Sequence, residues 1–103
     1  SVAMETLTYE AYGAGGAALI IEVLTDNRNK AAQEIKFILS KHNSSLGAAH
    51  SATWAFEKTS DGWIPKTTVD LNVADSNELI KLMEELEDND EVQGVFTNAE
   101  LTV

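Results

Sequence analysis

The stretch Thr25-Asp26-Asn27-Arg28-Asn29-Lys30 decides the fold, because it ends a strand and opens a helix within six residues. The apolar run Ala17 to Leu24 precedes it, and a helical pattern continues after it to Lys41. Asp26 or Asn27 can cap this helix, since a short side-chain oxygen there accepts from the unpaired N–H groups of the first turn. The stretch therefore predicts one strand–helix unit.

Two helices are predicted from apolar stripes with a helical period. The first ends near His42 or Asn43, and the second runs from about Ser76 to Glu87 with acidic residues on its outer side. The stripe of the first consists of Ala31, Ala32, Ile35, Ile38 and Leu39, and that of the second of Leu79, Ile80, Leu82, Met83 and Leu86. Each stripe fits a helix that packs on a sheet.

Further strands are predicted from alternating side chains. Ala52 to Lys58 and Trp63 to Leu71 alternate, and Thr59 to Gly62 joins them as a hairpin turn in which Gly62 accommodates a positive φ. The last strand runs from about Val92 to Asn98, and Glu5 to Tyr12 is expected to be an extended lead-in. The resulting order, strand–helix–strand, turn, strand–helix–strand, predicts a ferredoxin-like α+β sandwich, βαββαβ, with both helices on one face of an antiparallel sheet.

Length and composition indicate a single domain over residues 1–103, with residues 1–12 as a flexible lead-in. The chain has 103 residues, 44% of them hydrophobic, and no cysteine, which excludes disulfides, thiolate chemistry and cysteine-based zinc sites. No apolar run approaches the roughly 20 residues that span a bilayer. We therefore expect no membrane association and a cytoplasmic location, or the mitochondrial matrix in a eukaryote.

The net charge of −10 is unevenly distributed. Residues 27–56 contain four basic residues against one acid, whereas residues 70–103 contain ten acids against Lys81 alone. A strongly acidic chain binds nucleic acid weakly, because affinity for phosphates rises with the number of cations brought to them. One edge of the domain could still meet an anion while the other avoids it.

Catalytic, metal and cofactor sites are not predicted. Gly13, Gly15 and Gly16 precede a strand and are not followed by the Lys-Ser/Thr of a phosphate-binding loop. His42 and His50 lack the convergent partners of a metal site, and no serine lies in a nucleophile motif. We expect a protein that is not an enzyme and that needs no cofactor.

Several stretches together resemble the YebC/PmpR family, which includes the mitochondrial translational activator of cytochrome c oxidase subunit I. They are Tyr9 to Gly16, Thr25 to Asn29, Ser40 to His42 with Leu46-Gly47, Pro65 to Leu71, and Leu86 to Asn98. Departures from the family pattern occur at Ala11, Ala14, Phe37 and residues 43–45. The resemblance covers nearly the whole chain and its TDNRN run is the closest match.

The resemblance implies one domain of a larger family architecture, either excised from a longer protein or occurring naturally as a stand-alone second domain. Family members combine a basic N-terminal helical domain, a second domain of ferredoxin-like type and a third domain inserted between two strands of the second. This chain resembles the second domain alone, with Thr59 to Gly62 standing where the insertion would be. Family members are described both as ribosome-associated translation factors and as transcriptional regulators that bind DNA.

The predicted nucleic-acid or ribosome-binding surface is the exposed side of the first helix, where cations, amides and a ring come together as in RNA-binding sites. Its members are Asn27, Arg28, Asn29, Lys30, Lys36, Phe37, Lys41 and His42. The expected partner is the ribosome or ribosomal RNA, with DNA as an alternative. A rival interpretation is a small-molecule sensor or an oligomerisation module that uses an exposed sheet face or edge.

Overall fold

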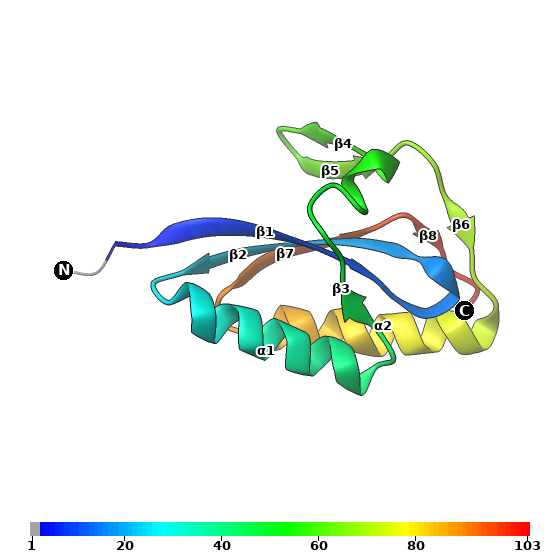
Figure 1. Ribbon diagram of the computed structural model, residues 1–103. Coiled ribbons are helices and arrows are strands. Elements are labelled where there is room, and N and C mark those ends of the chain that lie inside the picture. Colours follow the sequence, from blue (N-terminus) through cyan, green and yellow to red (C-terminus); the bar gives the residue numbers. More distant parts are fainter. Residues whose placement is uncertain (1–2) are drawn as a thin grey trace.

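A computed structural model describes residues 3–103 and shows a two-layer α+β core (Figure 1). Its main sheet is antiparallel with the strand order β3-β1-β2-β7, and both helices lie on one face of it. The elements are β1 Glu5–Tyr12, β2 Ala18–Thr25, α1 Arg28–Lys41, β3 Ser45–Leu46, α2 Val73–Asp88 and β7 Val92–Thr97. The predicted class and the placement of the helices are confirmed.

Strand β1 corrects the prediction of a flexible lead-in. It pairs with β2 along its whole length, from Glu5 opposite Thr25 to Tyr12 opposite Ala18. The two strands are joined by a turn containing the short helix η1, Ala14–Gly16, in which Gly15 has a φ of 68°. Residues 5–12 therefore form a full strand of the sheet, while residues 1–2 lie outside the described part of the chain.

The face of the sheet toward the helices carries the larger core. Alternate residues of β2, among them Leu19 and Ile21, pack on the apolar stripes of α1 and α2. Ile35 and Leu39 of α1 and Leu79, Leu82 and Leu86 of α2 are almost completely buried there. The helical periodicity in the sequence thus identified the residues that hold this layer together.

The two alternating segments after α1 do not join the main sheet. They form a separate hairpin, β4 Phe56–Thr59 and β5 Gly62–Pro65, which follows a short helix η2 at Thr53–Ala55 and lies over the other face (Figure 1). The predicted turn is confirmed, with Thr59 opposite Gly62. The predicted βαββαβ order is not found in the main sheet, which consists of β3, β1, β2 and β7, while the two strands of the hairpin pair only with each other.

The hairpin and η2 bury a second, smaller apolar cluster against this face. Ile20 and Phe56 are at most 3% exposed, with Tyr12, Trp63 and Phe96 packed around them. The expected exposed sheet face is therefore covered in this structure. Among residues 3–103, the outer side of β7 and most of the outer side of β1 have no strand beside them.

Two short strands form a separate small sheet. Strands β6, Val69–Asp70, and β8, Ala99–Glu100, pair in parallel.

Helix α2 begins earlier than predicted. The side chain of Asn72 accepts from the Asp75 N–H at 2.8 Å and so caps the start of this helix. Within the described residues, neither helix has the length and apolarity needed to cross a bilayer.

Candidate nucleic-acid interface

The start of α1 is built by the short side chains of the Thr25–Asn27 turn. The Asn27 side-chain oxygen accepts from the Lys30 N–H at 3.0 Å, which confirms Asn27 as the cap. The Asn27 N–H in turn donates to the Thr25 hydroxyl oxygen at 3.0 Å, and that hydroxyl donates to Glu91 at 2.8 Å. Asn27 thus contributes both its side-chain oxygen and its N–H to the start of the helix.

Arg28 is held by a carboxylate from β1. Its Nε and Nη2 donate to the two carboxylate oxygens of Glu5 at 3.2 and 2.9 Å, a bidentate pair on the surface. The Arg28 hydrogen bonds hold the pKa of Glu5 below its usual value, and Glu5 raises the pKa of Arg28. The Arg28 side chain remains 66% exposed, so another anion could reach it.

Lys30 forms an ion pair within α1. Its ammonium lies 3.3 Å from Glu34, one turn further along the helix. Glu34 also accepts from the Asn89 side chain at 3.0 Å. Hydrogen bonds from Asn89 and Lys30 lower the pKa of Glu34, so this acid stays charged beside the lysine at neutral pH.

The other end of α1 forms a charge cluster with α2. Lys41 pairs with Glu85, and the two ring nitrogens of His42 lie 3.2 and 2.9 Å from Glu78 and Glu85. Hydrogen bonds from Lys41 and His42 lower the pKa of Glu85. His42 is thereby placed between the helices, with a side chain only 14% exposed.

Phe37, Lys36 and Asn29 are exposed members of the predicted surface that have no carboxylate partner among the described residues. Phe37 is 63% exposed and carries the Lys41 ammonium 4.8 Å from its ring centroid. Lys36 and Asn29 are exposed, and neither side chain has an ion-pair or hydrogen-bond partner among residues 3–103. These two side chains are therefore free to meet a ligand.

The eight predicted residues do not form one uniformly basic patch. Arg28 and Lys41 stand at opposite ends of a 14-residue helix, about 20 Å apart at 1.5 Å per residue. Arg28, Lys30 and Lys41 each face a carboxylate, which balances much of their charge. The surface combines exposed but paired cations with the unpaired Lys36.

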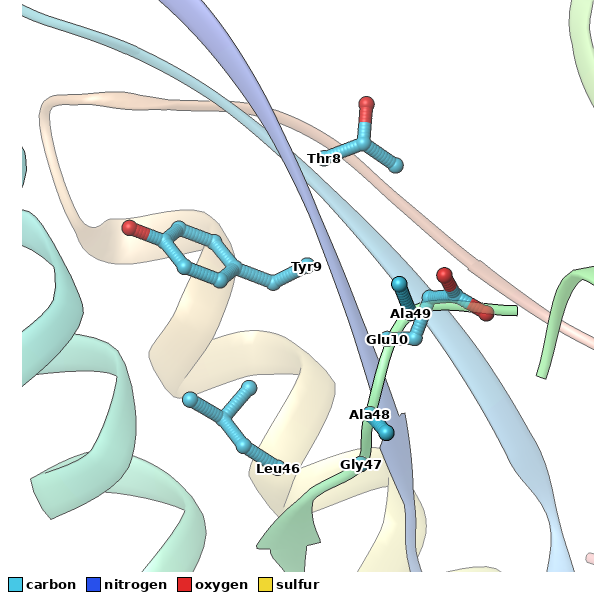
Figure 2. A pocket seen from close by; sticks show the side chains of 7 residues that line it. All are labelled: Thr8, Tyr9, Glu10, Leu46, Gly47, Ala48 and Ala49. Atoms are coloured by element: carbon cyan, nitrogen blue, oxygen red, sulfur yellow. The ribbon is translucent and has the colours of Figure 1, made fainter. Parts of the chain in front are cut away.

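A feature that the sequence did not indicate is a shallow cavity beside β1. It has a volume of about 150 Å³ and lies between β1 and the segment that follows β3 (Figure 2). Thr8, Glu10 and Ala49 point to one side of β1 there, and Tyr9 and Leu46 to the other. The segment is fastened by Glu10, whose carboxylate accepts from three backbone N–H groups, those of His50, Ala52 and Thr53, at 2.7 to 2.8 Å.

Acidic and histidine side chains do not converge on a metal site in the described part of the chain. Within residues 3–103, no three His, Asp or Glu side chains are arranged to hold a metal ion. Glu10 is the most buried acid, and its side chain is fully engaged by the loop that it anchors. The described part of the chain exposes one side of α1 and an edge of the main sheet, and its hairpin is docked on the other face of that sheet.

Comparison with known proteins identifies the family of this chain. A family model described as the TACO1/YebC second and third domain matches residues 4–61 and 58–99. The chain therefore belongs to the TACO1/YebC family, a family of regulators and not of enzymes. The two matched stretches meet in the turn between β4 and β5, where the sequence predicted an inserted third domain to be missing.

The relatives carry regulatory names. The chain is similar to a "Probable transcriptional regulatory protein" of Dictyoglomus thermophilum, 30% identical over 97% of this chain and 65% of the relative. A protein of the same name from Desulfosudis oleivorans is 30% identical over 95% of this chain and 64% of that relative. The chain thus spans about 65% of the length of these relatives, and their alignments extend over some 160 residues against 103 here.

A solved structure supports the fold. A conserved hypothetical protein of Aquifex aeolicus aligns with a TM-score of 0.89 at 22% identity, covering 97% of this chain and 66% of that protein. At this identity the likeness concerns the arrangement of strands and helices alone.

Proposed function

We propose that this domain regulates gene expression by contacting RNA of the translating ribosome through the exposed side of α1. The observation that carries the proposal is that four of the chain's seven basic residues lie on α1, beside the exposed Phe37 and Asn29. The acidic α2 and the C-terminal strands would face solvent or a protein. The protein would then act in the cytoplasm, or in the mitochondrial matrix of a eukaryote.

The ion pairs on α1 lower the affinity of this surface for phosphate but do not block it. Exposed pairs contribute only about 0 to 1 kcal/mol each, because water and salt screen them. A phosphate can therefore replace the Glu5 carboxylate at Arg28 or the Glu85 carboxylate at Lys41 at a small cost. With few cations and three competing acids, we expect weak binding that decreases steeply as the salt concentration rises.

A charge-reversal series tests the proposal. Binding of the chain to ribosomes and to a single-stranded RNA is measured over a range of salt concentrations for Lys36→Glu, and for Lys81→Glu as the matched control on the acidic helix α2. Loss of one phosphate contact should lower the slope of log affinity against log salt by about 0.7 for single-stranded RNA. We expect this change for Lys36→Glu and not for Lys81→Glu.

A second variant makes the test sharper because it should strengthen binding. Glu5→Gln removes the carboxylate charge that competes for Arg28, so its affinity for RNA should rise about threefold to tenfold. If Lys36→Glu, Lys81→Glu and Glu5→Gln bind ribosomes equally well, α1 is not the interface.

Two alternatives are decided by related measurements. Binding to duplex DNA, with the same pattern of variants, would favour a transcriptional regulator and fits the names of the relatives. A small-molecule sensor is less well supported, because ligand pockets have volumes of about 300 to 1,000 Å³ and the cavity beside β1 has about 150 Å³.

A further inference from the structure

The outer edge of β1 is open over most of its length. On its inner side β1 pairs with β2 throughout, but on its outer side β3 pairs only with Ala11 and Tyr12, and the Gly47 N–H donates to the Glu10 carbonyl. Within residues 3–103, no strand lies beside the stretch from Glu5 to Tyr9 on that side. An unpaired edge of this kind is a template for another strand.

The groups that face outward on this edge can be identified from the ladder. In an antiparallel strand, the N–H and C=O of one residue point to the same side, and this side alternates along the chain. Glu10 is bonded on the outer side, so Thr8 and Thr6 direct their N–H and C=O outward as well. Both threonines are exposed and short, and their side chains do not block an approaching strand.

An exposed apolar side chain and the cavity lie on the same edge. Met4, which precedes β1 by one residue, is 55% exposed. It has the same parity in the strand as Thr8 and Glu10, so it belongs to the same face of the sheet. The cavity lined by Thr8, Glu10 and residues 46–49 opens beside that face (Figure 2). Methionine is flexible and fills irregular apolar gaps well.

We propose that the occupant of this edge is β1 of a second copy of the chain, paired antiparallel about a twofold axis at Thr6. Thr6 then lies opposite Thr6 of the second copy, and Met4 lies opposite Thr8. This register uses the outward groups of Met4, Thr6 and Thr8 on both chains and stops short of Glu10, where Gly47 already occupies the edge. The two sheets become one continuous eight-stranded sheet.

The register is compatible with the side chains. Glu5 lies opposite Leu7 of the second copy, so no carboxylate faces another carboxylate across the strands. Glu5 can keep its pair with Arg28, and Leu7, half-buried in one copy, gains an aliphatic neighbour. Met4 of each copy reaches the cavity of the other. The short ladder and the charge of −10 predict a weak dimer that forms at high protein concentration.

Disulfide trapping tests both the partner and the register, since the chain has no cysteine of its own. Opposed residues in a hydrogen-bonded antiparallel pair have Cα atoms about 5.5 Å apart, within disulfide range, whereas residues displaced by two positions are beyond about 7 Å. Under mild oxidation Thr6→Cys should give a covalent dimer. Leu7→Cys, the matched neighbour, should stay monomeric.

Sedimentation equilibrium gives an independent measurement on the cysteine-free chain, over about 10 μM to 1 mM, the range of weak complexes. Thr8→Pro removes the outward N–H of residue 8 without removing a hydrogen bond to β2, whereas the matched variant Thr8→Val keeps this N–H. Loss of the two symmetric hydrogen bonds should raise the dimer dissociation constant about thirtyfold for Thr8→Pro. Thr8→Val should dimerise like the native chain.

The outcomes separate the proposal from its competitors. Monomer at every concentration, without cross-linking of Thr6→Cys, would overturn it and leave the edge to a different protein. Cross-linking of Leu7→Cys instead of Thr6→Cys would overturn the register. If Thr8→Pro leaves the dimer dissociation constant unchanged, the contact between the two copies lies elsewhere. None of these results depends on whether α1 binds RNA.

Discussion

Ile20 and Ile21 are neighbours in β2 and both are fully buried, yet they belong to different layers of the molecule. Ile21 packs in the large cluster between the sheet and the helices, whereas Ile20 packs in the small cluster under the hairpin. The buried interior of the helix layer is apolar, and its ion pairs, such as Lys41 with Glu85, lie nearer the surface. The hairpin layer adds two carboxylates, Glu10 and Glu22, that tie loops to the sheet.

The difference shows how a thin layer can be kept in place. Glu22 accepts from the Lys58 ammonium at 2.8 Å and from the Trp63 indole N–H at 2.9 Å, so one side chain of β2 contacts both strands of the hairpin. The Lys58 ammonium also lies 4.8 Å from the Trp63 ring centroid. The hairpin is therefore held by polar contacts between residues far apart in the sequence as well as by its small apolar cluster.

The largest effect should come from opening a cavity in the helix layer. Ile21→Ala should lower the free energy of unfolding by about 4 kcal/mol, and Ile20→Ala by about 3 kcal/mol, since the hairpin can close in where the helices cannot. Urea denaturation of both variants measures the difference. An equal or larger loss for Ile20→Ala would show that the hairpin layer is as rigid as the helix layer.

Substitution of Gly62 should have the next largest effect on stability. It has a φ of 110°, and a Cβ there would overlap the ring of Phe96 on β7. Gly62→Ala should therefore cost about 3 kcal/mol, from backbone strain and from displacement of the hairpin. The matched control is Gly16→Ala, where φ is 82° but the space is open, and strain alone should cost about 1 kcal/mol. Thermal unfolding of both variants separates the two contributions.

Glu10 should have a smaller, pH-dependent effect. Burial raises the pKa of its carboxyl, but the N–H groups of Ala52, His50 and Thr53 outweigh this and hold the pKa below 4.5. Its stabilisation is therefore fully present above pH 4.5 and is lost as the pH falls through the lower folded pKa. Glu10→Gln should cost about 1 to 3 kcal/mol at pH 7.

The same variant should lose less stability than the native chain between pH 6 and 3, which urea titrations at several pH values would reveal. An identical acid dependence would mean that Glu10 does not contribute in its charged form.

The smallest effect should come from Glu22→Gln. The Lys58 side chain is 54% exposed, so loss of the ion pair should cost only about 0.5 to 1 kcal/mol, and the glutamine oxygen can still accept from Trp63. The loss should shrink in high salt. Glu57→Gln, an exposed acid on the same hairpin, is the control and should be neutral.

Local signals in the sequence predicted much of the helix layer. The Asn27 cap and the apolar stripe gave the bounds of α1, and the Asp61-Gly62 pair gave the hairpin turn. The position of the hairpin could not be predicted in this way, because it depends on Lys58 and Trp63 meeting Glu22, a residue 36 and 41 positions away. Strand β1 was underestimated because its link to β2 is not a two-residue turn.

The candidate site was predictable only in part, for the same reason. Its residues do lie on α1, and Phe37 and Lys36 are exposed as the helical period indicated. The carboxylates that pair with Arg28 and Lys41 come from β1 and α2, which sequence spacing does not bring together. The cavity beside β1 likewise arises from the path of residues 46–49 and has no motif of its own.

The position of β7 has a consequence for biosynthesis. It completes the sheet against β2, where the Thr97 hydroxyl donates to the Ala18 carbonyl across 79 positions of sequence. Contacts at such separation form slowly. While the ribosome is still making the later segments, the apolar edge of β2 that will pair with β7 is therefore uncovered. In this interval a chaperone that binds nascent chains has the most exposed surface to protect.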